Sequence, residues 1–463
     1  MRNAFCTDKQ IDNRRSTAMK NHNISTAQFA LETALEKGCN DARITLNESR
    51  QNTFTFRNDQ LDRLQQATSS SLFLQLYVDG KYGTFSTNKM DRKDLLDFIS
   101  KGVEITKLIT EDKDRGLPDK NLYYRGGGKD LRQYDKLYSN ISTEQKINIA
   151  KECNYEILGK DERILNVTSE FSDYEDYNLI IDSQGFMGET EQTNFAISTD
   201  CSVKGREDAR PEGWWYESSL FFNKLYYRGC GERALERALK KIGPKKLKSG
   251  RYNMIVENTV SSRLIAPIIS AINGANIQQN NSFLQNKLGK KVFSPLLEIY
   301  DDAHLPESFG ARYFDSEGVA TQPMKIIDCG TINTYFVNSY YSKKTGLPVT
   351  VDSPSVPECY VAGENNCKII KDLDFLLNKS LNGVLVTGFN GGNSNSSTGD
   401  FSFGIEGFYF ENGECLFPVS EMNITGNIIS LWNSIVEIGN DPRTSNRWLI
   451  PSLLFEDVDF NGF

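Results

Sequence analysis

The chain has 463 residues, and its 53 Lys and Arg against 61 Asp and Glu give a formal net charge of -8 at pH 7. An acidic balance of this kind excludes a general attraction to nucleic-acid phosphates or to anionic membranes. The length and the 38% hydrophobic content are those of a globular protein of two or three domains.

The composition also predicts the compartment. The longest apolar run, residues 264–272, is well short of the roughly 20 residues that cross a bilayer. Residues 1–20 are polar and lack the apolar stretch of a secretory signal. The nine cysteines form no CxxC pair, which favours a reducing environment. We therefore expect a cytoplasmic protein with no membrane partner.

The first predicted helix lies near the amino terminus. Ser25 and Thr26 come directly before an apolar pattern with helical spacing, and Gly38 ends that pattern. A hydroxyl side chain at the start and a glycine at the end are typical of helix caps. The sequence therefore predicts a helix that begins at these residues, after a poorly ordered segment at 1–21.

A first α+β domain is predicted over residues 22–110. Short alternating runs at 42–47, 53–57 and 71–78, and a return over 82–86 after a turn at Asp79-Gly80, indicate hairpin strands. An apolar stripe with helical spacing over 91–108 predicts the amphipathic helix that closes the domain.

Residues 111–131 are rich in charge and are predicted to form a linker. Gly126, Gly127 and Gly128 lie within this segment. A phosphate-binding loop needs a strand before it and a helix after it, and this segment has neither. We therefore exclude a phosphate site at the three glycines.

The same order of elements returns in a second α+β domain, residues 132–242. Its predicted elements are a helix over 143–158, strands between 164 and 198, and a helix over 232–242. The repetition predicts that residues 22–242 arose by duplication of one helix, hairpin, helix motif.

Residues 243–463 differ from the preceding part in their pattern. Short strand-like runs alternate with turns rich in glycine and asparagine, which indicates a β-rich C-terminal domain. Helical intervals are predicted at 261–272 and at 284–288. The expected fold class is α+β, with a duplicated motif in the N-terminal half followed by the β-rich domain.

The count of histidines limits the catalytic chemistry. The chain has two, His22 and His304, whereas zinc sites that hydrolyse peptides usually take two or three from one chain. His22 is expected to be exposed in the polar amino-terminal segment. His304 follows Asp301 and Asp302, a set that could hold a divalent cation. Because neighbours on a strand point to opposite faces, a strand-ending turn is the favoured interpretation.

An aromatic cluster, Trp214, Trp215 and Tyr216, has two interpretations. Such side chains can form a platform for sugars or peptides, and they can equally anchor a loop on the core. The anchor is the favoured interpretation.

Several short motifs lie along the chain. They are Asp79-Gly80-Lys81, Leu288-Gly289-Lys290-Lys291-Val292-Phe293-Ser294-Pro295, Phe314-Asp315-Ser316-Glu317-Gly318-Val319-Ala320-Thr321, Gly388-Phe389-Asn390-Gly391-Gly392-Asn393, Thr398-Gly399-Asp400-Phe401-Ser402-Phe403-Gly404 and Pro451-Ser452-Leu453-Leu454. Together they resemble the TldD/PmbA family over about residues 22 to 463. Each motif is short, but the combination is specific.

The resemblance implies which type of subunit this is. In the family, the TldD-type subunit carries HExxxH on a helix of the third domain and hydrolyses peptides with zinc, and the TldE or PmbA-type subunit pairs with it. Counting back from the motif at 288–295 places Ile265, Ala266 and Ser270 at the first histidine, the glutamate and the second histidine. These side chains cannot replace the zinc ligands or the general base.

The leading hypothesis is therefore a noncatalytic TldE/PmbA-like subunit of a zinc metalloprotease that acts on flexible peptides. The resemblance implies that a TldD-like subunit holds the zinc, that this chain binds no cofactor, and that the substrate is an extended peptide. A homodimer is an alternative assembly. The candidate loop facing the partner or the peptide comprises Asn390, Gly391, Gly392, Thr398, Gly399 and Asp400.

Two alternatives stay open. The family's link to modulation of DNA gyrase suggests a regulator that binds gyrase or a toxin–antitoxin pair as a protein, since the sequence has no basic recognition helix for DNA. The second is a stand-alone hydrolase with a metal bound near Asp301, Asp302 and His304.

Overall fold

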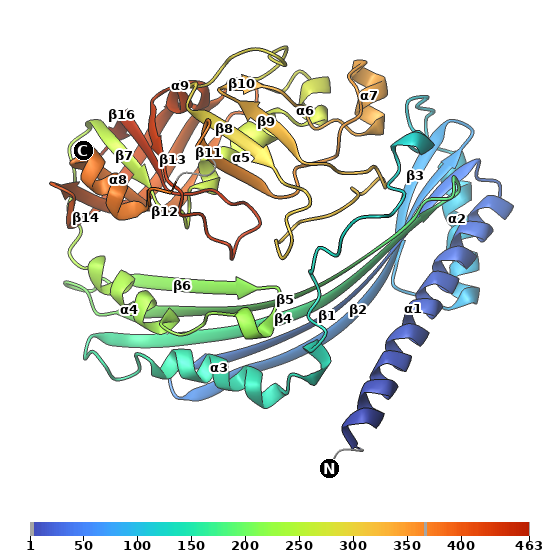
Figure 1. Ribbon diagram of the computed structural model, residues 1–463, viewed down its shortest axis with the longest axis horizontal. Coiled ribbons are helices and arrows are strands. Elements are labelled where there is room, and N and C mark those ends of the chain that lie inside the picture. Colours follow the sequence, from blue (N-terminus) through green and yellow to red (C-terminus); the bar gives the residue numbers. More distant parts are fainter. Residues whose placement is uncertain (1–3, 365–367, 463) are drawn as a thin grey trace.

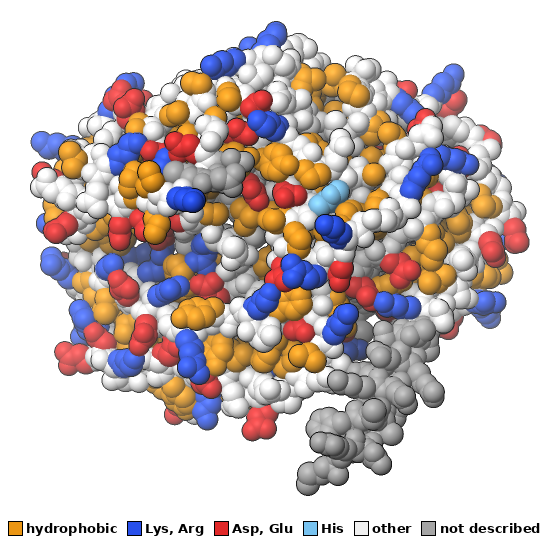
Figure 2. Space-filling view, viewed as in Figure 1, with side chains coloured by type: hydrophobic (Ala, Val, Ile, Leu, Met, Phe, Trp, Pro, Cys, Tyr) orange, Lys and Arg blue, Asp and Glu red, His pale blue; other side chains and the backbone are white. Residues whose placement is uncertain are grey.

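The computed structural model describes residues 4–364 and 368–462. Figure 1 shows a long curved sheet with helices on its outer side, and a C-terminal domain that lies over the concave side of the sheet. Basic and acidic side chains are interspersed on the face shown in Figure 2. Among the described helices, none is both long enough and apolar enough to cross a membrane.

The N-terminal half forms one six-stranded antiparallel sheet in the order β3-β2-β1-β4-β5-β6. β1 pairs with β4 from Arg43↔Asp182 to Arg57↔Thr168, so the two predicted α+β units share a single sheet. The strands are β1 (Asp41–Arg57), β2 (Gln60–Val78), β3 (Lys81–Thr87), β4 (Ile164–Asp182), β5 (Met187–Val203) and β6 (Glu212–Ser219).

Four helices cover one face of this sheet, two for each set of three strands. They are α1 (Ala4–Glu36), α2 (Arg92–Lys107), α3 (Thr143–Tyr155) and α4 (Cys230–Lys240). The order helix, three strands, helix therefore occurs twice, which confirms the predicted repetition of elements. Helix α3 begins with a capping box in which Ser142 and Gln145 bond each other's backbone N–H groups.

The alternation of side chains along each strand makes the two faces of the sheet different. On β1, Ile44, Leu46 and Phe54 are buried under the helices. Thr45 and Asn47 point to the opposite, concave face, because successive strand residues point to opposite faces. The helix side is therefore apolar, and the side toward the C-terminal domain is polar.

Three local predictions were wrong. Helix α1 begins at Ala4 and so continues through most of segment 1–21, and Ser25 and Thr26 lie inside it. No glycine or proline occurs between residues 4 and 36, so nothing in the backbone stops the helix at the hydroxyl residues.

The second error concerns strand length. Residues 60–70 form the first half of β2, although their polar sequence gives no alternating signal. Pairing with β1 determines their conformation, because tertiary context overrides intrinsic strand preference. Similarly, residues 284–288 form turns instead of a helix, with Asn286 in the left-handed region at φ 58°.

The C-terminal domain contains two sheets. One is four-stranded, in the order β10-β9-β8-β11, and the other has the order β14-β13-β12-β7-β16-β15. A further pairing of β14 with β16 closes the second sheet into a barrel-like ring. The elements are β7 (Gly250–Val256), α5 (Ser262–Ala271), α6 (Gly274–Gln278), β8 (Leu297–Asp301), β9 (Met324–Asp328), β10 (Thr331–Ile332), α7 (Ser339–Thr345), β11 (Pro357–Val361), α8 (Leu373–Ser380), β12 (Asn382–Ser394), β13 (Asp400–Glu411), β14 (Glu414–Asn427), α9 (Ile428–Asn433), β15 (Ile435–Ile438) and β16 (Leu453–Asn461).

A buried ion pair between β1 and β4 contacts the C-terminal domain. The Arg43 guanidinium lies 3.2 Å from the Asp182 carboxylate, and it also donates to the carbonyl of Glu317 at 2.7 Å. Tyr123, from the predicted linker, donates its hydroxyl to Asp182 at 2.6 Å. Three distant parts of the chain therefore meet at one carboxylate.

Candidate functional site

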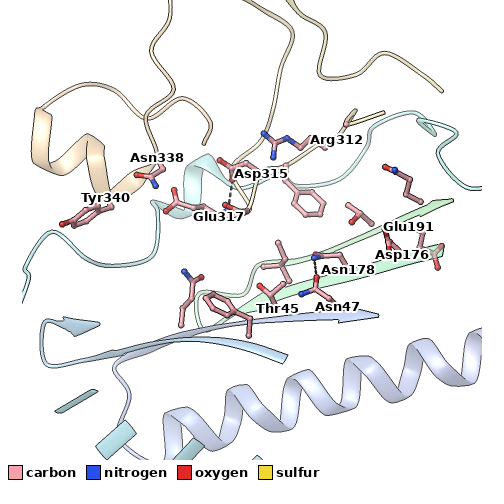
Figure 3. A pocket seen from close by; sticks show the side chains of 18 of the residues that line it. Thr45, Asn47, Asp176, Asn178, Glu191, Arg312, Asp315, Glu317, Asn338 and Tyr340 are labelled. Carbon is pink, nitrogen blue, oxygen red and sulfur yellow. Dashed lines mark hydrogen bonds between the residues drawn. The ribbon is translucent and has the colours of Figure 1, made fainter. Parts of the chain in front are cut away.

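A large hollow lies between the concave face of the sheet and the C-terminal domain. It is a cleft of about 730 Å³, and Figure 3 shows its two sides facing each other. Its floor comes from strands β1, β2, β4 and β5, and its roof comes from loops at 310–317 and around residue 338. Cleft sites between domains are frequent binding sites for small ligands and peptides.

The floor carries uncharged polar side chains beside two acidic ones, Asp176 and Glu191. Asn178 donates its amide to Asn47 at 2.5 Å, and Gln75 donates to the Tyr82 hydroxyl at 2.8 Å. Thr45, on the same face, is half-buried. Side-chain amides and hydroxyls both donate and accept hydrogen bonds, as a peptide backbone does. The floor can therefore offer both donors and acceptors to a peptide backbone.

The roof carries a compact set of charges. The buried Asp315 carboxylate accepts the backbone N–H groups of Glu317 and Val319 at 2.9 and 3.0 Å. Burial, together with the negative charges of Asp352 and Glu317, raises the pKa of Asp315 to about 7. Burial opposes ionisation of Asp352 too, but Arg312 at 2.9 Å and the hydrogen bonds of Ser316 and Ser353 together outweigh it and lower the pKa of Asp352.

The raised pKa of Asp315 has a consequence for stability. Between its ordinary value near 3.8 and about 7, the folded chain holds a proton that the unfolded chain has released. The stabilisation from this proton is complete below pH 3.8 and is lost as the pH rises through 7. We therefore expect the melting temperature of wild type, relative to Asp315→Asn, to fall between pH 4 and 8. A difference between the two proteins that stays constant across this range would contradict the assignment.

The predicted linker, residues 111–131, forms one wall of the cleft. Its Arg115 guanidinium lies over the ring of Tyr340 at 3.5 Å and over that of Tyr82 at 4.8 Å. Asp112 accepts the Tyr340 hydroxyl at 2.7 Å. The segment is thus fastened to both α7 and β3. Of the three glycines in this segment, Gly128 has no room for a larger side chain, because a Cβ there would lie 2.3 Å from the Tyr313 ring.

The positions aligned with the zinc motif lie on α5, in the C-terminal core. Ile265 is fully buried, Ala266 is half-buried and Ser270 is exposed. Asn276 bonds the carbonyl of Ser270 at 2.7 Å. None of these side chains offers a ligand atom that zinc in such sites prefers, and the three do not converge on one point. The residues present at these positions therefore do not fit a zinc ion.

The candidate partner-facing or peptide-facing loop is a strand and a turn. Asn390, Gly391 and Gly392 belong to β12, and Asp400 begins β13. The turn between them is closed by Asn427, whose amide donates to the Thr398 carbonyl at 2.8 Å and to the Asp400 carboxylate at 3.0 Å. Gly399 is buried and the other five residues are exposed. The prediction that these six residues form one loop was therefore wrong for residues 390–392, which belong to a strand.

The side chains of Asp301, Asp302 and His304 do not converge on a common metal site. The Asp301 carboxylate is buried and accepts the backbone N–H groups of Ser355 and Val356 at 2.9 and 2.6 Å. Asp302 caps the backbone N–H of His304 at 3.2 Å, as expected for a strand-ending turn. The His304 ring nitrogen lies 3.1 Å from the Thr321 hydroxyl.

One group of potential metal ligands does converge within the described residues, namely Glu298, Asp328 and Cys329. The Lys325 ammonium lies 3.0 Å from Glu298 and 2.9 Å from Asp328. The lysine is ion-paired with both carboxylates and occupies the space between them, so the cluster carries no indication of a bound metal.

The aromatic cluster lies on strand β6 instead of a loop. Trp215 packs on the core between the sheet and helices α3 and α4, which supports the anchor interpretation. The Arg443 guanidinium lies 4.2 Å from the Trp215 ring centre, and it donates to the Tyr216 carbonyl at 2.5 Å. The cluster therefore attaches the edge of the sheet to the C-terminal domain.

Sequence reasoning missed the residues that shape the cleft. Arg115 and Arg312 stand in segments without a strong pattern, and no local signal identifies them. Asp315 lies within the motif Phe314–Thr321, which was noted only as a family resemblance. An acidic residue followed by serine, glutamate and glycine is typical of a tight turn, and that signal could have singled it out.

Three family models match consecutive parts of the chain. They describe domain 1, the central domain and the C-terminal domain of the PmbA/TldA metallopeptidases, at residues 42–106, 136–242 and 249–462.

Individual relatives match nearly the whole chain. A Bacteroides thetaiotaomicron protein, named for a proposed modulation of DNA gyrase, has a crystal structure with a TM-score of 0.92 and 48% identity. The match covers 95% of this chain and 99% of that one. A Haemophilus influenzae protein named metalloprotease PmbA homolog is 27% identical over 94% of this chain and 95% of its own. TldE from Thermococcus kodakarensis has the same fold, with a TM-score of 0.80 at 17% identity and coverage of 94% and 100%.

Proposed function

Because this chain belongs to the PmbA/TldD metallopeptidase family, we propose that it is the noncatalytic subunit of a zinc metalloprotease complex that acts on flexible peptides. The observation that carries the proposal is helix α5. It has the burial and position of a central core helix, yet Ile265, Ala266 and Ser270 stand where the catalytic motif is expected. A TldD-like subunit supplies the zinc and the general base.

The cleft supports a role in handling peptide. Its floor offers the amides of Asn47, Asn178 and Gln75, and its wall offers the aromatic ring of Tyr340. An extended peptide exposes one amide donor and one carbonyl acceptor per residue, and these side chains can bind both. The subunit therefore contributes binding surface, and its partner contributes the chemistry.

Purified alone, the chain is expected to show no peptidase activity and to hold no stoichiometric zinc. Co-purification with a TldD-like protein from the same cell should give a complex that cleaves flexible peptides and loses activity on addition of a chelator. A matched control is the same complex with the motif glutamate of the partner changed to glutamine, which removes the general base. Zinc-dependent hydrolysis by the isolated chain, or failure to bind any TldD-like partner, would refute the proposal.

A second candidate is a regulator that binds DNA gyrase or a toxin–antitoxin pair as a protein, and it is favoured by the name of the Bacteroides relative. The net charge of -8 gives no support to direct binding of DNA. Pull-down of gyrase by the isolated chain, without a TldD-like subunit, would favour this alternative.

A further inference from the structure

Arg115 differs from the other two arginines of the cleft in the partners of its side chain. Arg312 is paired with Asp352 at 2.9 Å. Arg447 donates to the Ser355 carbonyl at 2.9 Å. The half-buried Arg115 guanidinium, in contrast, makes no hydrogen bond or ion pair with any residue in the described ranges 4–364 and 368–462. Its charge and its N–H donors are therefore available to a ligand.

Two tyrosine rings hold the Arg115 guanidinium in place. It lies 3.5 Å from the centre of the Tyr340 ring and 4.8 Å from that of Tyr82. Both rings are fixed, because Tyr340 donates its hydroxyl to Asp112 at 2.7 Å and Gln75 donates to the Tyr82 hydroxyl at 2.8 Å. Contacts with ring faces leave the N–H donors at the edge of a guanidinium free. Arg115 therefore presents a pre-positioned cation to the cleft.

Two acidic side chains at this end of the cleft already have other partners. Asp112 lies 3.0 Å from the Lys344 ammonium, in addition to its bond with the tyrosine hydroxyl. Glu317 accepts the backbone N–H and the hydroxyl of Ser339 at 2.8 and 2.6 Å. The planar fork of a guanidinium binds a carboxylate through two parallel N–H bonds. A carboxylate from a ligand is therefore the group that fits the free donors of Arg115.

The opposite end of the cleft is acidic. Figure 3 shows Tyr340 at one end, Asp176 and Glu191 at the other, and the polar floor between them. The strand pairings place Tyr82 and Asp176 in rows that cross β1 at residues 41 and 49, so roughly 27 Å of strand separates the two rows. An extended peptide of about eight residues spans this distance. The acidic end repels a carboxylate, and the Arg115 end attracts it.

We propose that Arg115 binds a carboxylate of an extended peptide, so that the end of the peptide that carries this group lies at Tyr82 and Tyr340 and the other end lies toward Asp176. The inference rests on the proposed role of the cleft in handling peptide, and it adds the chemical group that is recognised and the direction of the bound chain. A free peptide C-terminus and an acidic side chain near it supply the same group.

Isothermal titration calorimetry of the full chain with three peptides tests the proposal. The probes are an eight-residue peptide of alternating alanine and serine with a free carboxyl end, its C-terminal amide, and an amide with aspartate as the last residue. We expect wild type to bind the free acid at least about tenfold more tightly than the plain amide, the effect of one charge-assisted hydrogen bond. Tight binding of the aspartate amide would assign the carboxylate to a side chain as well, and weak binding would assign it to the terminus alone.

Variants of the arginine locate the binding group. Arg115→Gln should weaken binding of the free acid about tenfold or more and leave binding of the plain amide unchanged. Arg115→Lys should recover part of the affinity, because it keeps the charge but lacks the planar fork. The control Arg125→Gln removes the same charge from an exposed position of the same segment, outside the cleft, and should bind the free acid like wild type. Circular dichroism and melting temperature check that the variants fold.

Four results would overturn the inference. They are equal affinities of wild type for the free acid and the plain amide, no measurable binding of the free acid, unchanged binding of the free acid by Arg115→Gln, and an equal loss in Arg125→Gln. Each is measured on the chain alone, whereas the proposed function is tested by the peptidase activity of the complex. Failure of the inference is therefore distinguishable from failure of the proposed function.

Discussion

Replacing Asp182 with alanine is expected to lower the free energy of unfolding by about 3–5 kcal/mol. The carboxylate is fully buried and is the only acid within salt-bridge distance of Arg43 among the described residues. It also accepts the hydroxyl of Tyr123 and the backbone N–H of Phe186. Its removal leaves the buried guanidinium of Arg43 without a counter-charge, and unfolding in urea or by heat measures the loss.

Two further variants separate the buried charge from the loss of packing. The double variant Arg43→Met/Asp182→Leu should recover much of the stability, because no unpaired charge remains. Asp459→Ala breaks an exposed ion pair with Arg251 and should melt close to wild type. If Asp182→Ala unfolds like Asp459→Ala, the buried ion pair does not stabilise the fold.

Replacing Trp432 with alanine is expected to cost about 3–5 kcal/mol of unfolding free energy. Trp432 is among the largest fully buried side chains of the described chain. Its ring meets Phe455 edge-on at a centroid distance of 5.3 Å, and its indole N–H donates to the Leu264 carbonyl of α5 at 3.2 Å. The variant leaves a large cavity beside α5, and thermal unfolding would report it.

A conservative change at the same position gives a graded comparison. Trp432→Phe keeps most of the ring contact with Phe455 but loses the bond to Leu264, so roughly 1–2 kcal/mol should be lost. Equal losses for the alanine and phenylalanine variants would mean that the hydrogen bond, and not the packing, holds α5 in place.

The predictions that succeeded rest on local patterns. Helices α2 and α3 have apolar stripes, and Ser142 with Gln145 is a recognisable cap at the start of α3. The predictions that failed involve residues whose conformation depends on distant partners. The polar stretch at 60–70 is a strand because β1 pairs with it, and Ser25 is inside a helix because the preceding residues continue that helix.

In the candidate site, too, some features follow from local sequence and others from long-range contacts. Ile265, Ala266 and Ser270 were identified from the spacing of a motif, and their side-chain chemistry is a property of the sequence. The cleft, in contrast, brings Asn47 and Asn178 of the sheet opposite Asp315 of the C-terminal domain. Residues so far apart in the chain carry no shared local pattern, so no window of sequence could have grouped them.

The sequence by itself determined that this chain offers no pair of neighbouring histidines for zinc, and that its N-terminal elements repeat. Both follow from residue identity and short-range periodicity, which do not depend on how the chain folds back on itself. The tertiary structure alone decided that the two repeats share a sheet and that a buried Arg43–Asp182 pair links β1 of one repeat to β4 of the other. These features depend on long-range strand pairing and on burial, which are set by the whole chain.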